Sequence, residues 1–178
     1  VIRSRAVLCI RPEQPSDAAA IHAVHVAAFP TEAEARLVDA LRAARRLAAS
    51  LVADDGGTVV GHVAFSPVTL SQVAHETGGL GLGPLAVAAA RRREGIGGRL
   101  VRGGLAACAE RGFAFVVVLG DPRYYRRFGF HRASEHGLGN EYGADTEFMV
   151  LALRDGAMPP GGAVVRYAPE LALVATPD

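Results

Sequence analysis

The chain contains no tryptophan, no lysine and only two cysteines among its 178 residues. Two cysteines, Cys9 and Cys108, do not build the disulfide framework of a small secreted domain, and no CxxC pair or Cys/His cluster indicates a metal site. No apolar run is long enough to span a membrane, and the N-terminus lacks the layout of a signal peptide. We therefore expect a cytoplasmic protein with no metal and no membrane partner. Because the sequence begins with Val1 instead of methionine, a leader segment before Val1 is not excluded.

Net charge is also nearly absent. The 19 basic and 18 acidic residues leave a formal charge of +1. This balance argues against nucleic acid as a partner, because nucleic-acid binders carry a broad basic surface. Basic residues gather locally instead, at 91–93 and at Arg123, Arg126 and Arg127. Such local clusters favour a small anionic ligand over a polyanion.

Apolar residues are plentiful and make up 50% of the chain. They are sufficient to bury a core, and the length fits a single domain over 1–178. The segment 154–178 contains a Pro-Gly loop followed by apolar residues, which predicts a C-terminal strand or hairpin that extends the sheet. The same segment could instead pair with a second copy of the chain, so a homodimer is an open arrangement.

Hydrophobic periodicity predicts alternating strands and helices. One helix is expected after a cap at Ser16 or Asp17, and a second after a capping-box match between Thr31 and Glu34. Strands are expected at 8–11, in a hairpin over 50–70 that turns at 55–57, and at 80–87, 113–119, 130–133 and 147–153. Two further helices are expected at 96–111 and 122–128.

The order of these elements predicts the sheet. Strands 80–87 and 113–119 flank the long helix, and such a crossover favours parallel neighbours. The hairpin before them indicates antiparallel pairing elsewhere. The predicted fold class is therefore α/β, with a mixed, mostly antiparallel central sheet flanked by helices and one parallel, splayed strand pair.

The segment RRREGIGGRL, residues 91–100, stands where a strand passes into the long helix. Glycines at 95, 97 and 98 remove side chains there, and the first N–H groups of a helix lack partners and attract anions. A charged turn that only caps the helix explains the same residues. A Walker A loop is excluded because the chain has no lysine, and the spacing of GIGGRL breaks the G-x-G-x-x-G dinucleotide fingerprint.

Two segments together resemble the GNAT superfamily of N-acetyltransferases. GPLAVAAARRREGIGGRLV is similar to its acyl-CoA motif, an apolar strand followed by Gln/Arg-x-x-Gly-x-Gly/Ala, matched by Arg92, Gly95 and Gly97. VVVLGDPRYYRRFGF is similar to a later family segment that ends in Gly-Phe. The motifs cover about 80–130 and the architecture about 8–153, and the region looks like a small bacterial, mostly uncharacterised branch of the family.

The resemblance implies acetyl-CoA as co-substrate. Main-chain groups of Leu85, Ala86 and Val87 would pair with the pantetheine arm as an added strand. Backbone N–H groups from 93 to 98 would hold the pyrophosphate, with charge from Arg92 or Arg93. The candidate cofactor residues are Leu85, Ala86, Val87, Arg92, Arg93, Glu94, Gly95, Ile96, Gly97 and Gly98.

The resemblance also suggests a catalytic residue. Tyr125, five residues before Phe130, matches the family tyrosine that stands near the cofactor sulfur and can give the leaving thiolate a proton. A tyrosine that merely packs on the sheet is the alternative, and Tyr124 is interpreted as structural or substrate-lining. Cys108 falls on an apolar helix stripe and is not expected to act as a nucleophile.

No general base follows from the sequence. The strand 80–87 carries no carboxylate, and the nearby candidates are His62, His75 and Glu76. A water chain would serve as well. The resemblance implies that three residues between the first helices, Glu32, Glu34 and Arg36, could shape the acceptor pocket, and a solvated helix face is the alternative.

The predicted function is an acyl-CoA-dependent N-acetyltransferase in which an amine attacks the thioester directly. The acceptor is a small-molecule or peptide amine that the sequence does not identify. A non-catalytic acetyl-CoA-binding or sensor module of the same fold is the alternative, because the central strand lacks a carboxylate.

Overall fold

The computed structural model describes residues 7–71, 73 and 77–175. A seven-stranded sheet runs through the molecule in the order β1-β2-β3-β5-β6-β9-β7. Its strands are β1 (Leu8–Pro12), β2 (Ala49–Asp55), β3 (Thr58–Pro67), β5 (Gly79–Val87), β6 (Phe115–Leu119), β7 (His131–Arg132) and β9 (Phe148–Ala152). The helices are α1 (Ala18–Ala28), α2 (Ala33–Ala43), α3 (Ile96–Glu110), α4 (Pro122–Tyr125) and α5 (Ala172–Ala175).

Strand pairing confirms the predicted fold class. β5 and β6 run parallel, from Gly79 opposite Phe115 to Leu82 opposite Val118. Every other pair in the central sheet is antiparallel, including the β2–β3 hairpin. The parallel pair follows from the α3 crossover between β5 and β6, as the sequence predicts.

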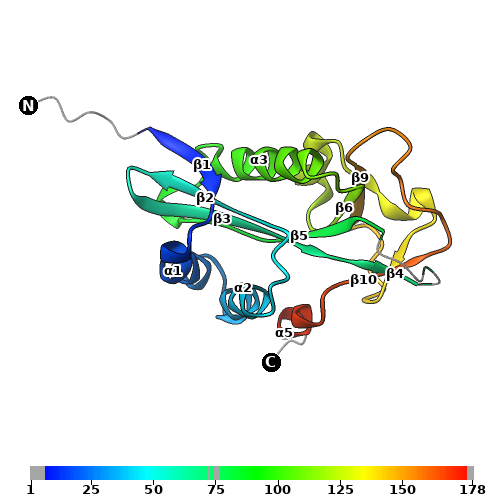
Figure 1. Cartoon of the computed structure of the whole chain (residues 1–178), viewed down its shortest axis with the longest axis horizontal. Coiled ribbons are helices and arrows are strands. Elements are labelled where there is room, and N and C mark those ends of the chain that lie inside the picture. Colours follow the sequence, from blue (N-terminus) through cyan, green and yellow to red (C-terminus); the bar gives the residue numbers. More distant parts are fainter. Residues whose placement is uncertain (1–6, 72, 74–76, 176–178) are drawn as a thin grey trace, which may run out of the picture.

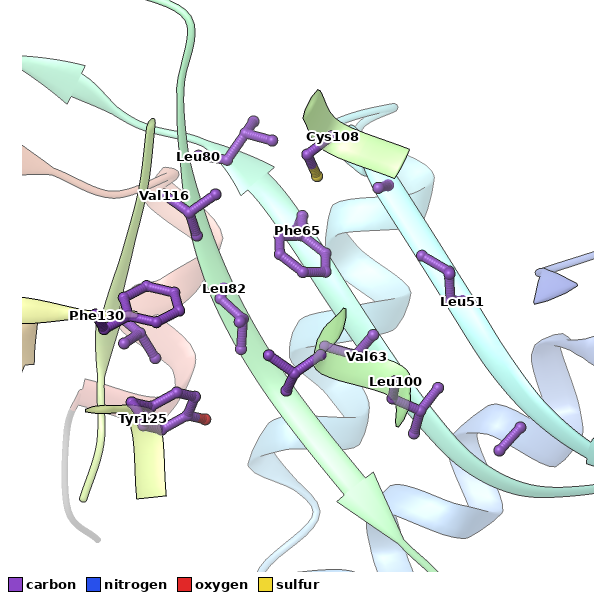
Figure 2. Close-up of a cluster of buried hydrophobic side chains, with 14 of the residues drawn as sticks. Leu51, Val63, Phe65, Leu80, Leu82, Leu100, Cys108, Val116, Tyr125 and Phe130 are labelled. Atoms are coloured by element: carbon purple, nitrogen blue, oxygen red, sulfur yellow. The ribbon is translucent and has the colours of Figure 1, made fainter. Parts of the chain in front are cut away.

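Helices cover the two faces of this sheet (Figure 1). α3 lies on one face, and α1 and α2 lie on the other. The buried stripe of α3 packs into the main core, as do Val63 and Phe65 of β3 and Leu82 of β5 (Figure 2). On the opposite face Ile21, Val38 and Val52 form a smaller apolar cluster. Packing on both faces of the sheet places α1 and α3 in contact with β5.

Close packing of α3 gives a test of the fold. A Cβ at Gly104 would lie 2.2 Å from Cε2 of Phe65, whose ring is fully buried. We expect Gly104→Ala to lower the free energy of unfolding by about 1–3 kcal/mol, because overpacking outweighs the gain in helix propensity. Gly103→Ala is the comparator, since its Cβ would lie 3.2 Å from Cγ2 of Ile10. Urea denaturation should show a smaller loss for Gly103→Ala, and equal losses would contradict this packing.

Two predicted helix caps are wrong. Asp17 does not cap α1, because its carboxylate accepts hydrogen bonds from Arg11 (Nη1–Oδ2, 2.7 Å) and from the backbone N–H of Gln14 (2.7 Å). The Thr31–Glu34 capping box does not form either. α2 begins at Ala33, whose N–H lies 3.3 Å from Thr31 Oγ1, so Glu34 falls in the first turn.

The C-terminal segment does not extend the central sheet, contrary to the expectation from sequence. β10 (Val164–Arg166) joins β4 (Thr69–Leu70) and β8 (Gly139–Asn140) in a separate three-stranded sheet. Val165 is fully buried there, in a second apolar cluster that also contains Phe115 and Val117 of β6. The last turns of the chain then pack on α2 through Leu171 and Val174 (Figure 1).

Within the described part of the chain, no helix combines the length and apolar character that a membrane crossing requires.

Candidate active site

The edge of β5 opens where its partner strand turns away. Pairing with β6 ends at Leu82, and Gly83 follows with φ +145°, a conformation that favours glycine. Leu85, Ala86 and Val87 continue to pair with β3 on their other side. The structure therefore leaves the β6-facing backbone of 85–87 without a strand partner among the described residues, which is the geometry that strand addition by a ligand requires.

The glycine-rich loop leads directly into α3. Gly95 has φ +78° and is the N-cap residue, and no side chain caps the helix. The first N–H groups of α3 are therefore free of side-chain acceptors and point out at the positive end of the helix dipole. Arg93 also has a positive φ of 65°, which turns the chain sharply before the helix.

The three arginines of the loop have different surroundings. Arg91 is paired with Asp55 and with Glu94 (Nε–Oε2, 2.9 Å). Arg92 lies across the gap between β5 and α1, with Nε 3.4 Å from the carbonyl oxygen of Val87. Arg93 is exposed and has no ion pair among the described residues. Arg92 and Arg93 thus both lack a carboxylate partner among the described residues, and Arg93 is in addition not held by carbonyl contacts.

Tyr124 approaches the start of α3. A Cβ at Gly97 would lie 2.7 Å from Tyr124 Oη, so the absence of a side chain at 97 makes room for this hydroxyl. The guanidinium of Arg127 stacks over the Tyr124 ring, 4.0 Å from its centroid, and adds a cation-π contact. The second family-like segment therefore packs against the first.

A cavity of about 450 Å³ lies between the open strand edge and these tyrosines. It is lined by Phe29, Glu34, Leu82, Gly83, Pro84, Leu85, Leu119, Gly120, Asp121, Tyr124 and Tyr125. Leu85 from β5 and Tyr125 from α4 thus face one space. The structure brings together the predicted catalytic tyrosine and part of the predicted cofactor strand.

Tyr125 is held rigidly in this wall. It is 9% exposed, and its ring packs edge-on against Tyr124, with centroids 5.0 Å apart. It packs in the same way against Phe130, with centroids 5.7 Å apart (Figure 2). Burial, with a smaller contribution from Tyr124, raises the pKa of Tyr125 well above its usual value. The phenol therefore keeps its proton at neutral pH and can donate it.

Other sequence candidates stand away from this cavity. Cys108 is buried in the α3 stripe, and burial raises the pKa of its thiol to about 12, so the thiolate is scarce at neutral pH. Glu32 and Arg36 form an exposed ion pair with each other (3.2 Å). His75 and Glu76 lie outside the described residues.

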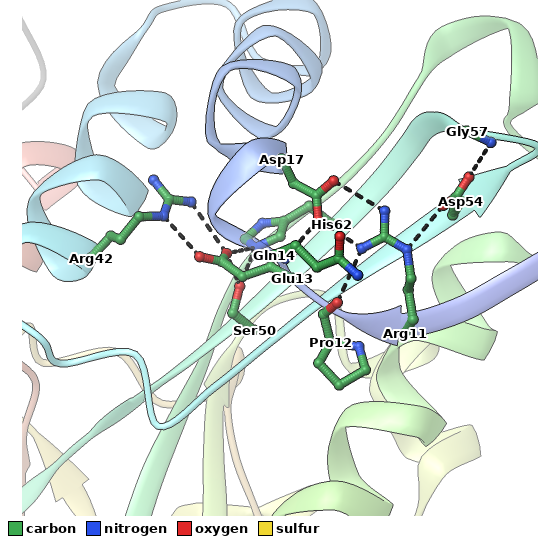
Figure 3. A network of polar contacts seen from close by, with 10 residues as sticks. All are labelled: Arg11, Pro12, Glu13, Gln14, Asp17, Arg42, Ser50, Asp54, Gly57 and His62. Atoms are coloured by element: carbon green, nitrogen blue, oxygen red, sulfur yellow. Dashed lines mark hydrogen bonds and ion pairs between the residues drawn. The ribbon is translucent and has the colours of Figure 1, made fainter.

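His62 belongs to a buried polar chain between β2, β3 and the adjacent helices (Figure 3). Glu13 accepts hydrogen bonds from Arg42 (Nε–Oε1, 2.8 Å) and from the Ser50 hydroxyl. Ser50 Oγ lies 2.8 Å from His62 Nε2, and His62 Nδ1 lies 2.8 Å from His25 Nε2. None of these five residues lines the cavity of Tyr125.

The positions of the protons in this chain of hydrogen bonds follow from the charge of Glu13 at one end. Burial alone would raise the pKa of Glu13, but hydrogen bonds from His62, Arg42 and Ser50 hold it well below its usual value. Ser50 therefore donates to the carboxylate and accepts from His62 Nε2–H, and His62 Nδ1 in turn accepts from His25. Both imidazoles are neutral, and His62 is a structural residue here instead of a free general base.

The two histidines predict a loss of stability in mild acid. Burial, reinforced by His62, lowers the pKa of His25 to about 3, and burial also lowers that of His62. An unfolded histidine takes up a proton near pH 6.5 while the folded one does not. The free energy of unfolding should therefore fall between pH 7 and pH 5, by about 2 kcal/mol for His25 and by a further amount for His62.

Urea denaturation at several pH values measures this loss. His25→Leu removes one of the two titrating groups, so it should reduce the pH-dependent loss by about 2 kcal/mol whatever its effect at pH 7. A slope that is the same in the wild type and in His25→Leu would contradict the assignment.

Sequence reasoning gave no site role to seven residues of the cavity and left Glu34 between an acceptor pocket and a solvated face. The seven are Phe29, Leu82, Gly83, Pro84, Leu119, Gly120 and Asp121. A signal for Glu34 was present in the sequence. Glu34 precedes Leu37 and Leu41 by three and seven residues, so the helical period places it on the buried face of α2.

Comparison with known proteins agrees with this geometry. Residues 9–133 match the family model described as the acetyltransferase (GNAT) domain. The N-acetyltransferase YhbS of Escherichia coli K12, itself described as uncharacterized, is 41% identical over 162 residues, which cover 90% of this chain and 96% of that protein.

Two crystal structures are also similar. YhbS from E. coli in complex with CoA superimposes with a TM-score of 0.88 at 38% identity, covering 97% of this chain and 95% of that one. A GNAT family acetyltransferase from Brucella melitensis in complex with acetyl-CoA gives a TM-score of 0.78 at 42% identity, covering 93% and 99%. The chain therefore belongs to the GNAT family of N-acetyltransferases.

Proposed function

We propose that this protein transfers the acetyl group of acetyl-CoA to an amine, which attacks the thioester directly. The observation that carries the proposal is the junction of three features around one cavity. Leu85 of the open backbone edge and the buried Tyr125 line this cavity, and Tyr124, which also lines it, reaches Gly97 at the uncapped start of α3. The CoA and acetyl-CoA complexes of the two similar proteins support the same assignment.

The residues present fit acetyl-CoA. The backbone of Leu85, Ala86 and Val87 would bind the pantetheine amides, and the N–H groups of 93–98 would bind the pyrophosphate, with Arg93 adding charge. Arg92 can serve there by releasing its carbonyl contacts. The missing side chain at Gly97 supports this reading, because any Cβ would fill the space under Tyr124.

Bound acetyl-CoA supplies an acyl thioester. The lone pair of the neutral amine attacks the carbonyl carbon, so a C–N bond forms while the C–S bond breaks. Tyr125 donates its phenolic proton to the departing sulfur, and the proton released from the amine nitrogen restores the phenol through solvent. The phenol is protonated before each turnover, and the raised pKa of Tyr125 makes it a weaker acid than an exposed tyrosine, so the transfer depends on its position beside the sulfur.

A cytoplasmic location is part of this proposal and rests on the two cysteines, Cys9 and Cys108, which are both unpaired. The homodimer expected as an open arrangement is testable by light scattering and is not needed for the chemistry.

Release of CoA thiol in the presence of acetyl-CoA and a broad panel of amines tests the proposal. We expect release that depends on the amine and saturates with acetyl-CoA. Binding of acetyl-CoA without amine-dependent release would overturn the enzyme assignment in favour of the acetyl-CoA-binding or sensor module.

A further inference from the structure

Three cavities meet at Glu34 in the first turn of α2. One is the cavity of about 450 Å³ that Tyr125 lines. A second, of about 330 Å³, lies beside it and shares Leu82, Gly83, Pro84 and Leu119 with it. A third, of about 910 Å³, opens between 31–36 and 169–174. Glu34 lines all three, so it stands between the outer opening and the reaction cavity.

The second cavity, which we call the acceptor chamber, is mostly apolar. Its walls are Glu34, Leu37, Leu82, Gly83, Pro84, Leu119, Tyr142, Tyr167, Leu171 and Val174. Tyr142 and Tyr167 lie against each other with ring centroids 5.9 Å apart and form an aromatic side. Glu34 is the one charged residue among these wall residues.

Two polar atoms of the chamber residues lack partners. Glu34 Oε2 and Tyr167 Oη are buried and have no hydrogen-bond partner among the described residues. Tyr167 as a whole is only 9% exposed. Buried polar atoms are nearly always paired in folded proteins, and an unpaired carboxylate oxygen costs free energy unless a ligand supplies a donor.

The charged residues that line the two cavities favour a cationic ligand. No arginine lines the chamber or the cavity of Tyr125. The other carboxylate, Asp121, is held by Arg123, which donates to it from its backbone N–H and its guanidinium. An ammonium group offers three donors and a positive charge to Glu34, whereas a ligand carboxylate would find no basic partner here.

We propose that Glu34 and Tyr167 bind the acetyl acceptor as an ammonium group, which loses one proton to solvent before the neutral amine attacks, and that the acceptor is a primary amine on an apolar, aromatic body without a carboxylate. The body would lie on Leu82, Pro84 and the Tyr142 ring. That the bound amine is the acetyl acceptor rests on the proposed function, whereas the binding of an amine at this site does not depend on it. A polyamine fits less well because its further charges would face apolar walls.

Calorimetric titration of 2-phenylethylamine tests the site without turnover. It is run with CoA, which carries no acetyl group, and again without CoA. We expect binding to the wild type that weakens about 30-fold in Glu34→Gln, which removes the charge, and about 5-fold in Tyr167→Phe, which removes one hydroxyl. Glu32→Gln is the matched control, because Glu32 is exposed and paired with Arg36, and it should bind as the wild type does.

Phenylalanine and spermidine complete the design. Phenylalanine adds a carboxylate to the same ring, and spermidine adds charge without a ring, so both should bind at least about 10-fold more weakly. Equal binding of 2-phenylethylamine by the wild type and Glu34→Gln overturns the inference, as does tighter binding of either competitor.

The outcomes also separate this inference from the proposed function. Glu34-dependent binding without any acetyl transfer to 2-phenylethylamine would uphold the site and contradict the proposed function. Acetyl transfer to other amines that is unchanged in Glu34→Gln would uphold the proposed function and overturn the site.

Discussion

Gly97→Glu is expected to abolish binding of acetyl-CoA. The new carboxylate would stand at the start of α3, where the proposed pyrophosphate site needs bare N–H groups, and its Cβ would meet Tyr124 Oη at 2.7 Å. At a ligand concentration 100 times Kd, acetyl-CoA should stabilise the wild type by about 2.7 kcal/mol, a rise in Tm of about 5–10 °C. Differential scanning fluorimetry should show no such rise for the variant.

Ala106→Glu is the matched control for this result. It adds the same charge to an exposed position of α3, away from the loop, and should retain the full rise in Tm. A second control separates the effect of the added negative charge from the effect of the added side-chain volume. Gly97→Ala should bind weakly, and adding Tyr124→Phe should recover part of the binding because it removes the hydroxyl that the methyl group meets. A full Tm rise in Gly97→Glu would exclude the loop as the pyrophosphate site.

Tyr125→Phe should reduce kcat by about 10²–10⁴-fold, the range that general acid catalysis contributes. The phenyl ring keeps the packing against Tyr124 and Phe130 and removes only the proton donor. The acetyl-CoA-induced rise in Tm should therefore be unchanged. Thiol release at saturating acetyl-CoA and amine measures the effect.

Tyr124→Phe is the comparison for the catalytic assignment. Tyr124 lines the same cavity, but its hydroxyl faces Gly97. Loss of this hydroxyl should therefore change the affinity for acetyl-CoA more than it changes kcat. If Tyr125→Phe turns over at the wild-type rate, Tyr125 has no part in proton transfer. A large loss in Tyr124→Phe alone would move the role to its neighbour.

Local signals in the sequence predicted much of this account. Short segments encode the glycine-rich loop at 95–97 and the crossover between β5 and β6, because residue spacing and hydrophobic periodicity within them indicate these structures. The family-like segments add the position of Tyr125. Each of these features is set within about 50 residues of chain, which is why they could be predicted.

Features that depend on distant segments were not predictable. Val165 of β10 pairs with Leu70 of β4, and that pairing is decided by apolar burial between segments far apart in the chain. His25 and His62, separated by 37 residues, meet only because α1 packs on β3. The acceptor chamber has the same origin, since Tyr167 and Glu34 come together after the C-terminal segment docks on α2.

The most direct test of the central claim is amide hydrogen exchange of the wild-type protein with and without acetyl-CoA. The account predicts protection at both 85–87 and 93–98, because both backbone segments gain hydrogen-bond acceptors from the bound ligand. Protection should be absent from both in Gly97→Glu. Unchanged exchange at these two segments in the wild type, while acetyl-CoA binds elsewhere on the protein, would contradict the account.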